Sequence, residues 1–201
     1  MNFGRLEVSG SALLAAALLY YLDKDGVVPW IFLSCLLHEC GHWWAIRMLG
    51  GKVVKLRLTC AGAELKLSAA RPLSPGQMVL SALAGPGVNL LLAWAGILFA
   101  QRGMGEKLYF FAGLNLGLAC FNLLPAGWLD GGRALENLLA LLGGRRLGQR
   151  MTKICSAGVI ALLLLSGAYL LWESEGRNFT LLIAGLWMAG AAQREQAAGV
   201  F

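Results

Sequence analysis

The feature that most constrains this 201-residue chain is a polar motif inside an apolar segment. His38, Glu39 and His42 form the pattern HExxH within the stretch 27–49, whose other residues are mostly apolar. These two histidines are the only ones in the chain. A glutamate and two imidazoles in an apolar segment of membrane-spanning length are energetically costly, and such groups usually mark a functional site. The segment is therefore predicted to be a spanning helix that carries such a site.

Composition favours a membrane protein over a soluble domain. The chain is 58% hydrophobic and only 14% charged, whereas an average soluble domain has about 25% charged residues. We predict an all-α polytopic membrane protein that forms a single membrane-embedded domain over residues 1–201, with about six transmembrane helices. The spans are expected at about 9–22, 27–49, 77–100, 108–124, 153–172 and 179–192.

The segment 51–70 has a different pattern. Apolar and charged residues partly alternate on both sides of the short tract 61–63, which predicts a β-hairpin between the second and third spans. The exposed edge of such a hairpin can pair with an extended peptide. The alternative is a hairpin that lies on the membrane surface.

The basic residues predict an orientation. The net charge is +6, and with a cytoplasmic amino terminus most of the 17 basic residues fall in cytoplasmic loops. The positive-inside rule then predicts a multi-pass protein of the bacterial cell membrane with both termini cytoplasmic and with contacts to membrane lipid. The cluster Arg145, Arg146, Arg150 and Lys153 either contacts substrate or lipid or only sets the topology. No nucleic-acid partner is expected, because no basic stripe with interleaved aromatic residues is present.

The spacing of the motif suits a metal. Residues four apart in a helix project from one face about 6 Å apart along the axis, so His38 and His42 can bind one tetrahedral Zn2+. Glu39 lies beside them and can take the proton of a zinc-activated water that attacks a carbonyl group. The alternative is a polar cluster that bridges helices without metal. Cys35 shares a face with His38 and is interpreted as a packing residue.

A catalytic zinc needs a third protein ligand, and no third histidine exists. By the predicted topology, only Asp130 and Glu136 remain as acidic candidates. Asp130 is preferred because Pro125 and Gly127 break the helix before it and let the chain turn back toward a buried site. Asp130 is equally suited to be the N-cap of a helix over 131–142.

Three sequence elements resemble the site-2 protease family of intramembrane metalloproteases. These are HECGH at 38–42, GPGVN at 85–89 and NLLPAGWLDGG at 122–132. The resemblance implies that His38, His42 and Asp130 hold one Zn2+ per chain and that Glu39 is the general base and acid. It also implies that Asn122 positions the substrate carbonyl or oxyanion, the alternative being a polar cap for the break at Pro125.

The same resemblance implies roles in the GPGVN element. Asn89 either orients the site or satisfies backbone groups freed by Pro86. Gly85 and Gly87 are expected to serve close helix approach. Trp43 and Trp44, beside His42, suit a membrane interface or a wall of the site.

The resemblance implies an intramembrane zinc endopeptidase that cleaves a transmembrane or membrane-associated protein. The small size and the lack of a PDZ domain are most similar to the branch of the stage IV sporulation protease, whose substrate is a pro-sigma factor; no CBS domain is expected either. Regulatory membrane proteins are expected as further partners. The alternative function is a non-catalytic metal-binding membrane protein, either a transporter or a regulatory scaffold.

Overall fold

The computed structural model describes residues 2–3, 6–8, 17, 20–21, 23–24, 26–59, 62–67 and 72–197. Side chains are described for these residues except 2–3, 6–8, 55–59, 62–67 and 194–197. The chain divides into two compact units, residues 1–121 and 122–201. Each unit is described by itself below, and the single domain over residues 1–201 stays a prediction.

The described residues of the first unit include three long helices, α2 (Val28–Met48), α3 (Pro75–Gln101) and α4 (Lys107–Asn122), the last of which ends at the unit boundary. Their bounds lie within two residues of the predicted spans 27–49, 77–100 and 108–124. The start of α3 has a local cause. Ser74 is the N-cap, its Oγ accepts a hydrogen bond from the Gln77 backbone N–H, and the Gln77 side chain accepts one from the Ser74 N–H.

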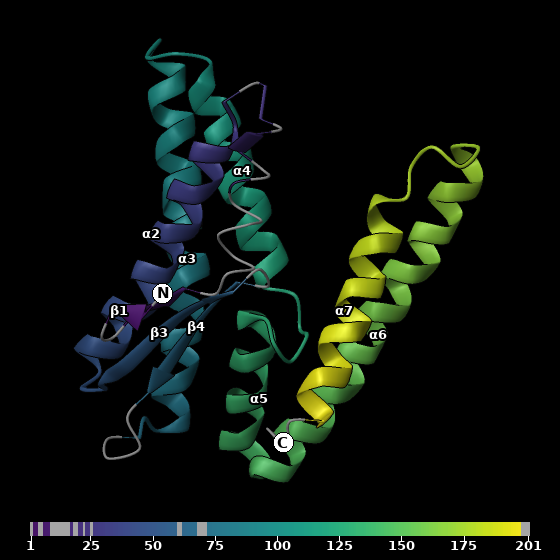
Figure 1. The fold of residues 1–201 in the computed structure, drawn as a ribbon. Coiled ribbons are helices and arrows are strands. Elements are labelled where there is room, and N and C mark those ends of the chain that lie inside the picture. The colour runs from purple at the N-terminus through teal and green to yellow at the C-terminus, as the bar shows by residue number, and fades with distance from the viewer. Residues whose placement is uncertain are drawn as a thin grey trace. The chain divides into compact units, whose positions relative to one another are not determined.

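Close contacts between small residues hold these helices together. Figure 1 shows α2 lying along α3. A Cβ added at Gly41 of α2 would lie 2.9 Å from the Ala84 carbonyl oxygen of α3, and one added at Gly96 would lie 3.1 Å from Ala112 of α4. Glycine at these positions therefore lets the backbones approach closely, as small residues do between membrane helices.

The first unit also contains a four-stranded sheet in the order β1-β2-β3-β4. Its strands are β1 (Asn2–Phe3), β2 (Leu6–Val8), β3 (Val53–Thr59) and β4 (Gly62–Leu67). β2 pairs with β3 in parallel, and β3 pairs with β4 antiparallel. The antiparallel pair occupies the segment predicted to form a hairpin. The connecting residues 60–61 lie outside the described part of the chain, so the hairpin as a whole stays a prediction.

The second unit contains α5 (Asp130–Gly143), α6 (Arg145–Glu173) and α7 (Thr180–Ala197), with α7 lying along α6 (Figure 1). α6 begins at Arg145 and not near Lys153, as the fifth span was expected to. Gly144 separates α5 from α6 with a positive φ of 83°, which glycine adopts at little cost. The basic residues after it therefore belong to the first turns of the helix and not to a loop.

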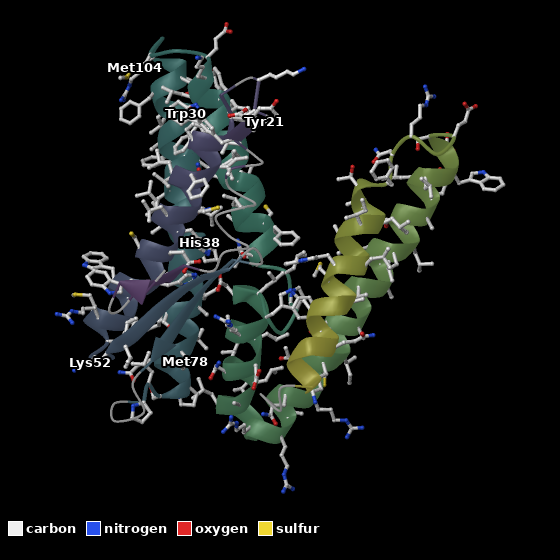
Figure 2. The ribbon with its side chains drawn as sticks, viewed as in Figure 1. Tyr21, Trp30, His38, Lys52, Met78 and Met104 are labelled. Carbon is white, nitrogen blue, oxygen red and sulfur yellow. The ribbon has the colours of Figure 1, made fainter. Side chains whose placement is uncertain are left out.

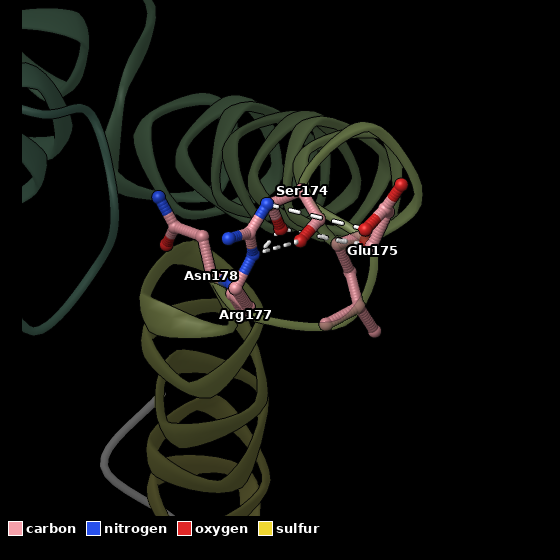
Figure 3. A network of polar contacts seen from close by, with 5 residues as sticks. Ser174, Glu175, Arg177 and Asn178 are labelled. Carbon is pink, nitrogen blue, oxygen red and sulfur yellow. Dashed lines mark hydrogen bonds and ion pairs between the residues drawn. The ribbon is translucent and has the colours of Figure 1, made fainter.

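A short turn joins α6 to α7, and Figure 3 shows its polar contacts. The Ser174 hydroxyl accepts a hydrogen bond from the Asn178 N–H at 2.9 Å, and the Arg177 Nε–H donates to the Ser174 carbonyl at 3.2 Å. Glu175 has a φ of 52°, in the left-handed region that favours glycine. Its ion pair with Arg177 is 4.0 Å long and highly exposed, so it adds little stability.

Two helices of the described chain are long and apolar enough to cross a membrane, α3 and α6. A shorter apolar helix spans Thr180–Gln193. Most of the predicted first span, 9–22, lies outside the described residues. The described chain is thus mostly helical with two candidate spans, which agrees with a predicted helical membrane protein. The count of six spans stays a prediction.

Candidate metal centre

The two motif histidines lie one turn apart on a buried face of α2, and Figure 2 shows the position of His38 within that helix. Their side chains are 7% and 8% exposed, which excludes a solvated polar face. The two Nε2 atoms are 3.0 Å apart. Two nitrogens bound to a tetrahedral zinc at 2.0–2.1 Å would be separated by about 3.3 Å. The imidazole pair therefore fits such an ion with an adjustment of a few tenths of an ångström.

A backbone contact sets the orientation of His42. Its Nδ1 lies 2.7 Å from the carbonyl oxygen of Ser81 in α3. A carbonyl oxygen only accepts hydrogen bonds, so Nδ1 carries a hydrogen, and Nε2 is the ring nitrogen that is directed toward His38. Metal-binding histidines are usually oriented by such a bond from the ring nitrogen remote from the metal. The imidazole thus has the direction that metal binding needs.

Gly85 of α3 lies directly against the two imidazoles. A Cβ added there would lie 2.8 Å from the Nε2 of His38 and would also contact the Nε2 of His42. The expected close approach is therefore present at Gly85. The expectation is wrong at Gly87, where an added Cβ would meet no described atom within 4 Å. Only the first of the two glycines leaves room beside the histidine pair.

The residues of α2 near the two histidines differ in their exposure. Glu39 is half-buried. Cys35, Trp43 and Trp44 are exposed. The exposure of Trp43 and Trp44 among the described residues favours the first of their two expected roles, a membrane interface, over a wall of the buried site.

The second unit contains the NLLPAGWLDGG element at 122–132, which includes the break between α4 and α5. The Gly127 N–H donates to the Ser156 hydroxyl at 2.9 Å, and that hydroxyl donates to the Thr152 carbonyl at 2.7 Å. A Cβ added at Gly131 or Gly132 would contact backbone carbonyls of this turn. The two glycines after Asp130 therefore allow the turn to fold tightly onto the start of α5.

Asp130 is buried, with 7% of its surface exposed, and it is the first residue of α5. The N-cap is Leu129, so the N-cap role that the sequence allowed for Asp130 is not observed. Asn122 is the last residue of α4. The first unit thus brings His38 and His42 together, while Asn122 and Asp130 belong to the second unit.

Asn89 is a buried polar residue whose role the sequence left open. It is completely buried one turn beyond Gly85 in α3, and its side-chain amide has no hydrogen-bond partner among the described residues. It therefore does not bond a backbone group freed by Pro86, which was one of its two expected roles.

Comparison with known proteins gives a consistent result. Residues 97–166 match the model of Peptidase family M50, and this segment contains the second motif. A zinc metalloprotease of Methanocaldococcus jannaschii is 26% identical over 171 residues, which cover 82% of this chain and 48% of that protein. YwhC of Bacillus subtilis, which carries a provisional zinc metalloprotease name, is 38% identical over 123 residues, covering 51% and 54% of the two chains.

The fold has a solved counterpart. The site-2 protease from Methanocaldococcus jannaschii matches with a TM-score of 0.69 over 94% of this chain and 89% of that chain, at 23% identity. These findings confirm the predicted resemblance to the site-2 protease family: part of the chain matches Peptidase family M50, and its fold is similar to that of a site-2 protease. The chain spans about half the length of the curated relatives it matches. The likeness to the sporulation branch stays a prediction.

Proposed function

We propose that this chain is an intramembrane zinc endopeptidase that hydrolyses a peptide bond of a membrane-associated protein within or next to the bilayer. The observation that carries the proposal is the buried imidazole pair, whose Nε2 atoms lie 3.0 Å apart with His42 held by the Ser81 carbonyl. The match to Peptidase family M50 and the names of the relatives support the same chemistry. An orienting bond of this kind is typical of a metal ligand.

One zinc ion per chain is the proposed cofactor, held by His38, His42 and Asp130. The third ligand is proposed on chemical grounds: the chain has no third histidine, and a carboxylate is a usual partner of two histidines at catalytic zinc. Asp130 is a buried carboxylate, and its position in a tight glycine turn fixes its backbone. Zinc bound there would polarise the scissile carbonyl and lower the pKa of water.

The remaining chemistry falls to two polar side chains. Glu39 is next to His38 and half-buried, so its carboxylate can take a proton from water and pass it to the leaving amine. Asn122 can donate a hydrogen bond from its amide to the oxygen that becomes negative during attack. We assign Glu39 as general base and acid and Asn122 as the group that positions the carbonyl.

The proposed substrate is held in an extended conformation, because a helix hides its carbonyl groups from attack. β4 lies at one end of the sheet order, and its outer edge is proposed to pair with the substrate. A pro-sigma factor is the proposed substrate type, with regulatory membrane proteins as further partners. The proposed setting is the bacterial cell membrane, crossed by six spans with both termini cytoplasmic.

A non-catalytic metal-binding protein is the competing function. A transporter should carry polar residues along a path across the membrane, whereas the 18-residue core of α6 combines high hydropathy with at most two charged residues. A scaffold has no need of Glu39, which the chain retains.

The test of the ligand assignment compares the two acidic candidates. Zinc content is measured on purified Asp130→Ala and Glu136→Ala proteins in detergent after extensive dialysis. We expect the first variant to lose zinc and the second to keep about one ion per chain. Loss of zinc from the Glu136 variant alone would overturn the assignment of Asp130. Cleavage of a membrane-anchored reporter by the Glu136 variant, but not by the Asp130 variant, completes the expected result.

A further inference from the structure

Three polar side chains are completely buried in the first unit away from the catalytic motif. Ser34 of α2, Asn89 of α3 and Asn115 of α4 are each 0% exposed. Each comes from a different helix, and the helices are otherwise apolar along much of their length. A buried amide without partners is expensive in such an environment, because no solvent compensates for its lost hydrogen bonds. These three residues therefore need a common explanation.

The packing of α2 against α3 sets the level of the cluster. His42 lies opposite Ser81 and His38 lies opposite Gly85, so the two helices run antiparallel. Ser34 is four residues before His38, and Asn89 is four residues after Gly85. At 1.5 Å per residue, both lie about 6 Å beyond the histidine level in the same direction. The backbones of Ser34 and Asn89 therefore lie at one level, one helix turn from the candidate metal centre.

Asn115 joins α4 to this level. Its Nδ2 donates to the Ser34 hydroxyl at 3.0 Å and to the Phe111 carbonyl at 2.9 Å. The two amide hydrogens are thus used, but the Oδ1 of Asn115 has no partner among the described residues. The Oδ1 and the Nδ2 of Asn89 likewise have no partner there. The cluster consequently presents two acceptors and a two-hydrogen donor that no described protein group satisfies.

We propose that Ser34, Asn89 and Asn115 form an internal water-binding site between α2, α3 and α4, one helix turn from His38. A buried water usually makes about three hydrogen bonds to otherwise unsatisfied groups. Here it donates to the Oδ1 atoms of Asn115 and Asn89 and accepts from an amide N–H of Asn89. The water is the element that links Asn89 of α3 to the direct Asn115–Ser34 bond.

The site also places Asn89 near the metal centre. Helical side chains lean toward the amino-terminal end of their helix, so Asn89 covers the turn that contains Gly85. Gly85 in turn contacts both imidazoles. Asn89 and its water are therefore positioning elements that fix the distance of α3 from α2 beside His38. This link to the metal rests on the proposed function, whereas the water site itself does not.

The first experiment detects the water directly. The full chain is labelled with nitrogen-15 asparagine in detergent micelles, and magnetisation transfer from water to the side-chain NH2 groups is recorded. Asn89→Leu and Asn115→Leu variants assign the two signals. We expect both groups to contact a long-lived water, while the exposed Asn137 contacts only rapidly exchanging water. The absence of a long-lived contact at Asn89 in the unsubstituted chain would overturn the proposal.

The second experiment tests whether the water is shared and whether it positions the site. In the Asn89→Leu variant, the long-lived water contact of Asn115 should disappear, and zinc affinity should fall about tenfold, the lower end of the effect of groups that orient metal ligands. Asn137→Leu is the matched control and should change neither. An unchanged water contact at Asn115 would overturn the shared site. If the unsubstituted chain binds no zinc, the proposed zinc endopeptidase function fails. The water contacts of Asn89 and Asn115 then still test the water-binding site.

Discussion

The substitution Gly85→Ala probes the geometry of the proposed metal centre with a single methyl group. The added Cβ would lie 2.8 Å from the Nε2 of His38 and 2.6 Å from the Cε1 of His42. Reaching an ordinary contact of 3.4 Å requires shifts of 0.6 Å (3.4 − 2.8) and 0.8 Å (3.4 − 2.6). Zinc–ligand distances tolerate only about ±0.2 Å. The methyl group therefore cannot be accommodated without displacing the ligands.

The expected loss can be estimated. Misplacing the groups that orient a metal ligand lowers affinity by about 10- to 100-fold, or about 1.4 to 2.8 kcal/mol. Ala is also a better helix former than Gly by about 0.8 to 1.0 kcal/mol, so α3 itself should not unfold. Gly85→Ala should consequently keep its helical content while losing both zinc affinity and cleavage.

Gly87→Ala is the matched control, since it adds the same methyl group to the same helix where no described atom lies within 4 Å. Zinc affinity is measured by competition with a chromophoric chelator on purified protein in detergent, with circular dichroism as the check on folding. The control should bind zinc as the unsubstituted chain does. If Gly85→Ala bound zinc with unchanged affinity, the inference that Gly85 lies against the metal-binding nitrogens would be refuted.

Two further predictions concern the second unit. Ser156→Ala removes the hydroxyl that accepts a hydrogen bond from the Gly127 N–H. The free energy of unfolding, measured by denaturation in mixed micelles, should therefore fall by about 1–3 kcal/mol. An unchanged value would mean that water replaces the hydroxyl. Glu175→Gly relieves the positive φ at this position and should raise the free energy of unfolding by up to about 1 kcal/mol. The exposed ion pair that the substitution removes contributes little. A loss of stability would contradict this interpretation of the turn.

The sequence predicted the helices that carry the motifs well. Long apolar runs leave few alternatives, so α2, α3 and α4 begin and end within two residues of the predicted spans. The sequence does not predict the start of α6, because a run of basic residues from Arg145 is also typical of a loop beside a span. Arginine is a good helix former, and a basic first turn is compatible with a helix that continues into an apolar segment. The charge pattern therefore did not locate this helix boundary, and the membrane orientation that it predicts stays a prediction.

The polar partners of the site were less predictable. The bond from His42 to the Ser81 carbonyl joins residues 39 positions apart, and a backbone acceptor leaves no mark in side-chain patterns. The short strands β1 and β2 were also not expected, because two or three residues give no recognisable alternation. The GPGVN element predicts close helix approach equally for both of its glycines. Only the packing of α2 against α3 distinguishes Gly85 from Gly87.

The proposed mechanism depends on proton transfer by Glu39 at a zinc ion held by the two histidines. The most direct measurement compares the unsubstituted chain with Glu39→Gln for both zinc content and cleavage of a membrane-anchored reporter in detergent. Gln is nearly isosteric but cannot act as a base, so we expect about one zinc per chain in both proteins and cleavage only by the unsubstituted chain. Equal cleavage by the two proteins would rule out Glu39 as the base, and the absence of zinc from both would rule out the proposed zinc site.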